Sequence, residues 1–272
     1  MSSYDYDVIG IIAKTDFLPP YFAIAQKALR LMSNEDIQFH ELATVFETDQ
    51  ALVSKLLGLV NSTFYGLPRQ ITRIPDALSY LGLKETRNLV WAVCTKEVFS
   101  SRSDHNTWHH SLSTAYLAEA LAKYSRKGID QNHAFTAGLV HDIGIAFINK
   151  KIPEANEEIL LKIDLGRSRL DAERSVLGMD HAAIGGIILR QWSVPQIIIE
   201  AVQYHHFPWK IDNPLCPIIA LANQVSNQSQ AKTITVEPRL LEFSLISQED
   251  LRTLNSATQV TISNFENKIS GS

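Results

Sequence analysis

The sequence has few of the features that would assign it to a specialised class of protein. Only two of its 272 residues are cysteine, Cys94 and Cys216, and no Cys-x-x-Cys pair is present, which argues against a disulfide framework or a cysteine zinc site. No apolar run approaches the length of a membrane span. The amino terminus, MSSYDYDVIGIIAKTD, carries acids where a signal peptide needs a basic start. We therefore expect a soluble protein of the reducing cytoplasm, with no membrane partner.

An excess of basic charge is also missing. The 25 basic and 29 acidic residues give a formal net charge of -4. The chain therefore has no overall positive field to attract a phosphate backbone, although this does not exclude a local basic patch. We expect no nucleic-acid partner. The composition, 45% hydrophobic and 20% charged, is that of a globular chain long enough for one large domain or two modest ones.

Alternating, strand-like runs are few, and helical periodicity covers most of the chain. The segment LPPYFAIAQKALRLM predicts a helix with one apolar face. Residues on that face are Phe22, Ala25, Leu29 and Met32. FHELATVFE and ALVSKLLGLVN repeat this spacing, with Asp49 at the position of a helix cap, and Pro75 suits the first turn of the next helix. The expected fold class is all-α.

The pattern also suggests where the helical groups divide. We expect the first hundred residues to form one compact group of helices and the residues to about 226 to form a second group. The polar run SSRSDHNT at 100–107 is the expected junction between them. The tail from 227 is more polar and ambiguous between short strand and helix. Within the first group, NSTFYG is either a functional loop or a structural turn. We favour the turn, with Asn61 and Ser62 satisfying the preceding helix end and Gly66 taking an unusual backbone angle.

Histidines are the most informative residues. Six of the nine lie in TWHHSLSTA, GLVHDIGIAF, GMDHAAIGGIIL and YHHFP, each an apolar or amphipathic stretch. A lone histidine is usually a satisfied core or surface residue, and we place His40, His105 and His133 in that class. Several buried imidazoles without a shared ligand would each need a separate partner. Adjacent His141 and Asp142 on a helix are expected to reach one metal ion from neighbouring directions.

The ordered set of histidines resembles the HD superfamily of metal-dependent phosphohydrolases. More narrowly, residues 14–226 resemble the HDOD domain, a bacterial signalling relative of the HD-GYP phosphodiesterases, through LPPYFAIAQKALRLM, ALVSKLLGLVNSTFYG, ALSYLGLKETRNLVWAV and the segments from WHHSLSTA to YHHFP. The resemblance implies a multi-helix HD-type bundle with an N-terminal helical subdomain at 14–100, a metal-site subdomain at 107–226 and a C-terminal extension at 227–272. The metal ligands that it implies are His110, His141, Asp142, His181, His205, His206 and Asn223. The resemblance places His109 at the surface or behind the ligands. It also places Gly185 and Gly186 where a neighbouring helix approaches closely.

The sequence departs from the catalytic pattern at several positions. Asn223 stands where active hydrolases of the superfamily usually have an aspartate, and it brings no negative charge to a cation. Ile145 stands where a lysine commonly holds the substrate phosphate. No GYP signature follows YHHFPWKIDNP, and Asn106 replaces a carboxylate that would recruit a further ion. The implied cofactor is one divalent transition ion, iron, manganese, zinc or nickel, rather than two.

Three functional classes remain. The favoured hypothesis is a signalling module that retains an HD-type metal site, hydrolyses weakly or not at all, and acts through a signalling protein partner. The alternative is a phosphohydrolase of nucleotides or cyclic dinucleotides, in which Asp142 is catalytic and bridges two ions. This alternative needs a replacement cation, for which Lys150, Lys151 and Arg190 are candidates. The third possibility is a helical domain whose polar cluster is only structural.

Overall fold

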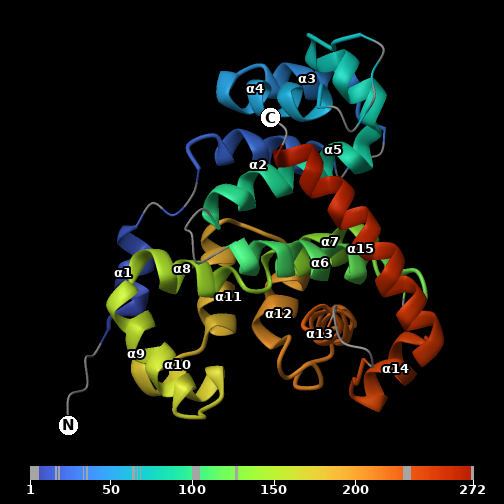
Figure 1. Cartoon of the computed structure of the whole chain (residues 1–272). Helices are drawn as coiled ribbons and strands as arrows, with labels where there is room; N and C mark the ends of the chain where they lie inside the picture. The colour runs from blue at the N-terminus through green and yellow to red at the C-terminus, as the bar shows by residue number, and fades with distance from the viewer. Residues whose placement is uncertain are drawn as a thin grey trace. The chain divides into compact units, whose positions relative to one another are not determined.

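The computed structural model describes residues 6–15, 17, 19–32, 34, 36–62, 65, 67, 69–99, 105–125, 128–228 and 234–270. Over these residues the chain forms helices joined by turns and irregular segments, with no strand, so the all-α prediction is confirmed (Figure 1). The chain divides into two compact units. The larger unit is residues 1–17 and 98–258, and the smaller unit is residues 18–97 and 259–272.

The smaller unit is built from helices. They are α2 (Phe22–Leu31), α3 (Phe39–Phe46), α4 (Gln50–Val60), most of α5 (Ile74–Val98) and the end of α15 (Gln248–Ser270). Of these, α2 and α3 are strongly amphipathic. The predicted apolar face of α2 is buried, and Asp49 caps α4 by accepting a hydrogen bond of 2.9 Å from the Leu52 backbone N–H. Helix α5 is interrupted at Gly82, whose φ of 73° and ψ of 170° suit only glycine.

The turn after α4 has a structural role at Asn61. The Asn61 amide donates to the carbonyl oxygens of Leu57 and Ile71 and accepts from the Ile71 N–H, so it satisfies the helix end as expected. The Ser62 hydroxyl does not, because it is buried without a hydrogen-bond partner among the described residues. The expectation for Gly66 lies outside the described residues.

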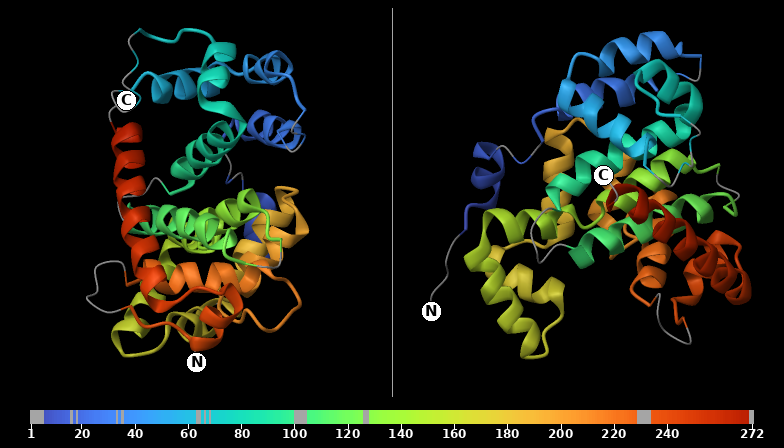
Figure 2. Two further views of the ribbon diagram at one scale, coloured as in Figure 1. Left: turned by 90° about the vertical axis from the view of Figure 1, so that its right-hand side faces the viewer. Right: turned by 45° about the horizontal axis from the view of Figure 1, so that its top comes forward.

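The larger unit contains the histidine segments. Its helices are α1 (Val8–Lys14), α6 (His105–Ala122), α7 (Gln131–Val140), α8 (Ile143–Lys151), α9 (Pro153–Asp164), α10 (Arg169–Leu177), α11 (His181–Gln191), α12 (Gln196–Tyr204), α13 (Leu215–Ser226), α14 (Pro238–Ser244) and the start of α15. Helices α6 and α7 lie side by side, and α13 packs against both (Figures 1 and 2). All residues from 134 to 140 and nearly all of α13 are buried, so these two helices form the centre of this unit.

Local caps fix the helices that carry the histidines. Asp130 accepts hydrogen bonds from the Asn132 and His133 N–H groups at the start of α7. Asp180 accepts from the Ala183 N–H at the start of α11, whose first residue is His181. These bonds satisfy backbone donors that the first helical turn leaves unpaired. The polar tail, whose structure the sequence left ambiguous, forms α14 and α15.

Candidate metal centre

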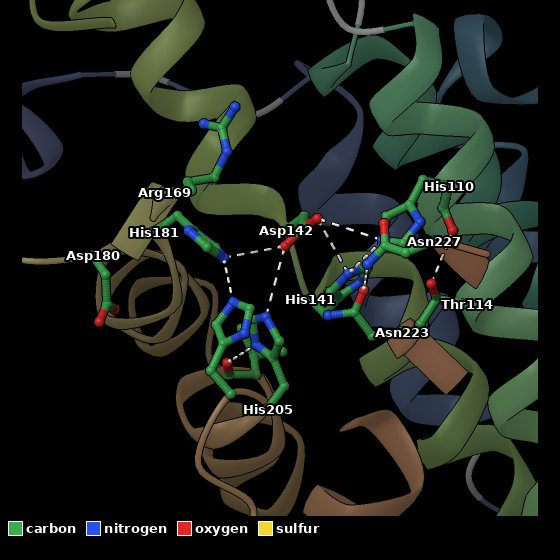
Figure 3. A network of polar contacts seen from close by, with 12 residues as sticks. His110, Thr114, His141, Asp142, Arg169, Asp180, His181, His205, Asn223 and Asn227 are labelled. Carbon is green, nitrogen blue, oxygen red and sulfur yellow. Dashed lines mark hydrogen bonds and ion pairs between the residues drawn. The ribbon is translucent and has the colours of Figure 1, made fainter. Parts of the chain in front are cut away.

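His141 and Asp142 lie at the junction of two helices rather than within one, which corrects the expectation from the sequence. His141 is the C-terminal cap of α7, and Asp142 precedes the first residue of α8. In a continuous helix, adjacent side chains point about 100° apart. The Asp142 backbone, with φ -101° and ψ 18°, departs from helical geometry, and both side chains face the same space (Figure 3).

Two glycines, each three residues from His141, bring other helices to this junction. A Cβ on Gly138 would lie 2.7 Å from the Ala115 Cα, so α7 contacts the backbone of α6. A Cβ on Gly144 would lie 2.0 Å from the carbonyl oxygen of His181, so α8 contacts the start of α11. The absence of a side chain at each position permits a backbone approach that no other residue allows.

The structure brings six of the seven predicted ligands into two groups around Asp142 (Figure 3). In the two-histidine group, the Nε2 atoms of His110 and His141 are 3.1 Å apart and lie 3.7 and 3.2 Å from Asp142 Oδ2. The three-histidine group is His181, His205 and His206. The Nε2 atoms of His181 and His205 lie 3.3 and 3.7 Å from Asp142 Oδ1, and those of His181 and His206 are 2.9 Å apart.

Hydrogen bonds on the far side of three imidazoles orient the rings. The Nδ1–H groups of His141 and His205 donate to the carbonyl oxygens of Gly138 and Val202, at 2.8 and 2.7 Å. Since a carbonyl can only accept, Nδ1 carries the proton and Nε2 keeps its lone pair. In His181, Nδ1 donates to Glu173 Oε2 at 2.6 Å. All three Nε2 atoms therefore point toward Asp142, and those of His141 and His205 have the tautomer that a metal ligand requires.

The electrostatics of the cluster favour neutral imidazoles at His110 and His206 and a protonated imidazole at His181, around an ionised carboxylate. Burial and the neighbouring His141 lower the pKa of His110 to about 4, and burial with His181 lowers that of His206 to about 4. Although burial raises the pKa of Asp142, His141 and His181 lower it well below its usual value. Burial lowers the pKa of His181, but its hydrogen bonds to Asp142 and Glu173 outweigh this and raise it to about 10.

The residues present fit a divalent cation. His205 Nε2 is buried and has no hydrogen-bond partner among the described residues, and an unpaired buried nitrogen is costly unless a ligand satisfies it. Five imidazoles and one carboxylate are the donor types that zinc, iron, nickel and manganese accept. The distances of 2.9 to 3.7 Å between donor atoms are those expected between ligands about 2.1 Å from one ion.

The seventh predicted ligand, Asn223, lies beside the two-histidine group (Figure 3). It is buried on α13 and forms a side-chain hydrogen bond with His110. Its Oδ1 also accepts a hydrogen bond of 2.9 Å from Asn227 Nδ2. Asn223 therefore borders the cluster, but its only ligand atom is already an acceptor within the protein. Its role as a metal ligand stays a prediction.

Sequence reasoning missed Glu173, which lies on α10 behind His181. It is fully buried, and its Oε2 accepts hydrogen bonds from both the backbone N–H and Nδ1 of His181, at 2.8 and 2.6 Å. Arg169 Nη1 lies 3.4 Å from its other oxygen. The available signal was a carboxylate on the same face as Ala172, Val176 and Leu177, all buried, because a carboxylate among apolar residues needs a partner.

The lysines and arginine considered as replacement cations lie far along their helices. Arg190 is nine residues after His181 in α11, about 13 Å along the axis, and it bonds the Gln203 side chain at the surface. Lys150 is eight residues after Asp142, about 12 Å along α8, and Lys151 is one further. Their role as replacement cations stays a prediction.

Cys94 and Cys216 are buried free thiols, as expected. Gly185 and Gly186 allow the predicted close approach of a neighbouring helix, since a Cβ at either would lie 3.1 to 3.3 Å from side-chain atoms of α12. Among the described residues, no helix combines the length and hydropathy needed to cross a bilayer.

The helical fold and the histidine–aspartate cluster define a protein of the HD superfamily. Residues 18–208 match the sequence model of the HDOD domain, and the chain belongs to the HDOD family. It is 27% identical over 273 residues to an uncharacterized protein of Treponema pallidum, covering 94% of this chain and 51% of that protein. It is also 28% identical over 151 residues to ribonuclease Y of Opitutus terrae, covering 56% of this chain and 24% of that protein. The chain thus spans about half of the first relative and a quarter of the second.

Solved structures share the fold at low sequence identity. A Shewanella amazonensis protein, described provisionally as a phosphohydrolase, has a TM-score of 0.75 and 21% identity, with 98% of this chain and 100% of that chain covered. A Marinobacter aquaeolei protein, described provisionally as a signal transduction protein, has a TM-score of 0.77 and 19% identity, with 92% and 58% covered. At these identities the similarity establishes the fold and leaves the activity open.

Proposed function

We propose that this chain is a signalling module that holds a divalent transition metal at the Asp142 cluster and hydrolyses phosphate esters weakly or not at all. The observation that carries the proposal is the buried, unpartnered Nε2 of His205 facing the ionised Asp142. Membership of the HDOD family supports it. Iron, manganese, zinc and nickel all suit the imidazole-rich donor set.

Weak hydrolysis follows from charges that the site lacks. A bound divalent cation would supply Lewis acidity and activate water. The chain itself must hold the phosphate and offset the negative charge that develops on its oxygens. Ile145 and Asn223 offer no charge for this purpose. Since loss of one preorganised group typically lowers kcat by about 100-fold or more, two such losses leave little turnover.

The alternative function is a metal-dependent phosphohydrolase acting on a nucleotide or cyclic dinucleotide. One observation favours it, namely that the two oxygens of Asp142 face separate groups of histidines, the arrangement that a two-ion site requires. In that case Asp142 is the essential residue. The ribonuclease Y relatives act on RNA by name, so RNA also belongs among the substrates to test.

A hydrolysis screen separates these two functions. Untagged protein loaded with manganese, iron, cobalt, nickel or zinc is incubated with nucleotides, cyclic dinucleotides and a short RNA. Asp142→Asn removes the shared carboxylate, and His133→Gln on α7 is the matched control outside the cluster. We expect bound metal but turnover far below that of an ordinary enzyme. Ordinary turnover that Asp142→Asn abolishes and His133→Gln retains would establish the hydrolase instead.

The proposed output is contact with a signalling protein. The smaller unit provides a helical surface that the metal cluster does not use, and the net charge of -4 does not favour nucleic acid. Cross-linking in cells followed by mass spectrometry, repeated with Asp142→Asn, tests this. We expect the same protein partner to be recovered repeatedly, and recovery of RNA alone would contradict the proposal.

A further inference from the structure

We propose that the two donor groups bind metal in a fixed order, the three-histidine group first and tightly, the two-histidine group second and weakly. This inference rests on the proposed function, because it concerns the same centre. It adds which residues hold the resident ion and why the remaining positions contribute less.

The two groups differ in the number and type of their donors. The three-histidine group offers the Nε2 atoms of His181, His205 and His206 together with Asp142 Oδ1, which makes four donors. Four ligands complete a tetrahedral shell of the kind that zinc prefers. The two-histidine group offers two Nε2 atoms and Asp142 Oδ2, so a fourth ligand must come from Asn223 or from solvent.

The two groups also differ in the support behind their ligands. The carboxylate of Glu173, fully buried, accepts the Nδ1–H of His181 at 2.6 Å. A carboxylate behind a histidine ligand fixes the ring and raises its basicity, and loss of such a partner typically lowers metal affinity by about 10- to 100-fold. In the two-histidine group, His141 is supported by the neutral carbonyl of Gly138. The outer charge therefore favours the three-histidine group.

Desolvation of the donor nitrogens also favours the three-histidine group. The His205 side chain has no exposed surface, and its Nε2 has no partner among the described residues. A cation at this position satisfies a nitrogen that is otherwise a cost to the fold. His110 differs, because 16% of its side chain is exposed and its Nε2 lies within hydrogen-bond distance of His141. Each group contains one contact between Nε2 atoms that binding must break, His110 with His141 at 3.1 Å and His181 with His206 at 2.9 Å. The unpaired Nε2 of His205 is therefore the difference between the groups.

The negative charge of the cluster limits binding of a second ion. Asp142 carries the one carboxylate shared by both groups. An ion that binds first neutralises it and repels a second ion nearby. Asn223, a neutral amide whose oxygen already accepts from Asn227, does not restore the missing charge. The second ion therefore meets both fewer donors and less negative charge.

Cobalt titration of untagged, chelator-treated protein tests the order, read by absorption spectra and by equilibrium dialysis. The variants are His205→Gln in the three-histidine group and His110→Gln in the two-histidine group. Wild type should bind in two steps that differ in affinity by about tenfold or more. His205→Gln should remove the tight step, whereas His110→Gln should keep it and remove the weak one. Circular dichroism confirms that each variant is folded.

Asn223→Asp provides a test that does not depend on removing a ligand. It adds a carboxylate beside His110, so the weak step should tighten by about tenfold or more while the tight step keeps its spectrum and affinity. A tight step that survives His205→Gln, that is lost in His110→Gln, or that strengthens in Asn223→Asp would overturn the proposed order. Absence of any cobalt binding to wild type would overturn the proposed metal centre itself, and the order with it.

Discussion

Replacing Glu173 by glutamine removes one charge and keeps the shape of the side chain. Because Glu173 is fully buried behind His181 and contacts its backbone and its ring, the substitution changes the support of a ligand without touching the ion. We expect the folded protein to bind metal more weakly, chiefly in the three-histidine group.

The free energy that the substitution should cost can be worked out in two ways, with similar results. The bond from His181 Nδ1 to Glu173 Oε2, at 2.6 Å, is charge-assisted, and such bonds contribute about 1.5–3 kcal/mol. Loss of an outer-shell carboxylate costs about 10- to 100-fold in metal affinity, which is about 1.4–2.7 kcal/mol. The ion pair between Arg169 and Glu173, 3.4 Å long, contributes little to this energy, because the Arg169 side chain is 36% exposed to solvent.

Cobalt or zinc affinity, measured by competition with a chromogenic chelator, is the assay. Glu158→Gln is the matched control, since Glu158 forms an exposed pair with Lys162 on α9 and does not contact the cluster. The control should bind metal as wild type does. If Glu173→Gln also binds metal with wild-type affinity while wild type binds tightly, the carboxylate does not support His181 and the reasoning is refuted.

Two further substitutions test how the helices are held. Asp130→Ala should destabilise the protein by about 1 kcal/mol through loss of the α7 cap. Burial raises the pKa of Asp130, but the capping N–H groups lower it below its usual value. The stabilisation by this cap is therefore present above about pH 4 and disappears as pH falls through the folded-state pKa. Urea unfolding at pH 7 and pH 3 measures the difference in unfolding free energy between wild type and Asp130→Ala, and an unchanged difference would contradict this. Gly144→Ala should cost about 3 kcal/mol or more and weaken metal binding, since its Cβ would overlap the carbonyl of His181. The matched change Gly186→Ala, which meets only the flexible Gln203 side chain, should cost less than about 1.5 kcal/mol, and equal melting temperatures for these two variants would count against the close contact.

The helices could be predicted where a local signal determined them. Asp49 caps α4 because its carboxylate reaches the Leu52 N–H three residues on, a contact that depends only on the neighbouring chain. The buried face of α2 follows from its spacing in the same way. In the polar tail, α15 forms although its composition left strand and helix equally open, and the packing of its buried Leu251, Ile262 and Phe265 accounts for this.

Contacts between distant segments could not be predicted from the sequence. Glu173 supports His181 from eight residues away across the turn between α10 and α11, and no motif marks that distance. The sequence indicated that His141 and Asp142 act together, but a helical position for both would have sent their side chains apart. Only the ending of α7 at this point lets both reach the same space.

The positions that shape the cluster differ from those where charge is missing. Gly138 and Gly144 admit α6 and α11 by backbone contact, and the junction between them places Asp142 where both groups meet. Ile145 and Asn223 are instead the positions where a charge expected of a hydrolase is missing. We therefore propose that this pattern separates formation of the cluster from the charge that stabilises a phosphoryl transition state. The double variant Ile145→Lys, Asn223→Asp should accordingly raise phosphodiesterase activity without moving the ligands. If metal-loaded protein of this double variant is still inactive, more than charge separates this site from a hydrolase.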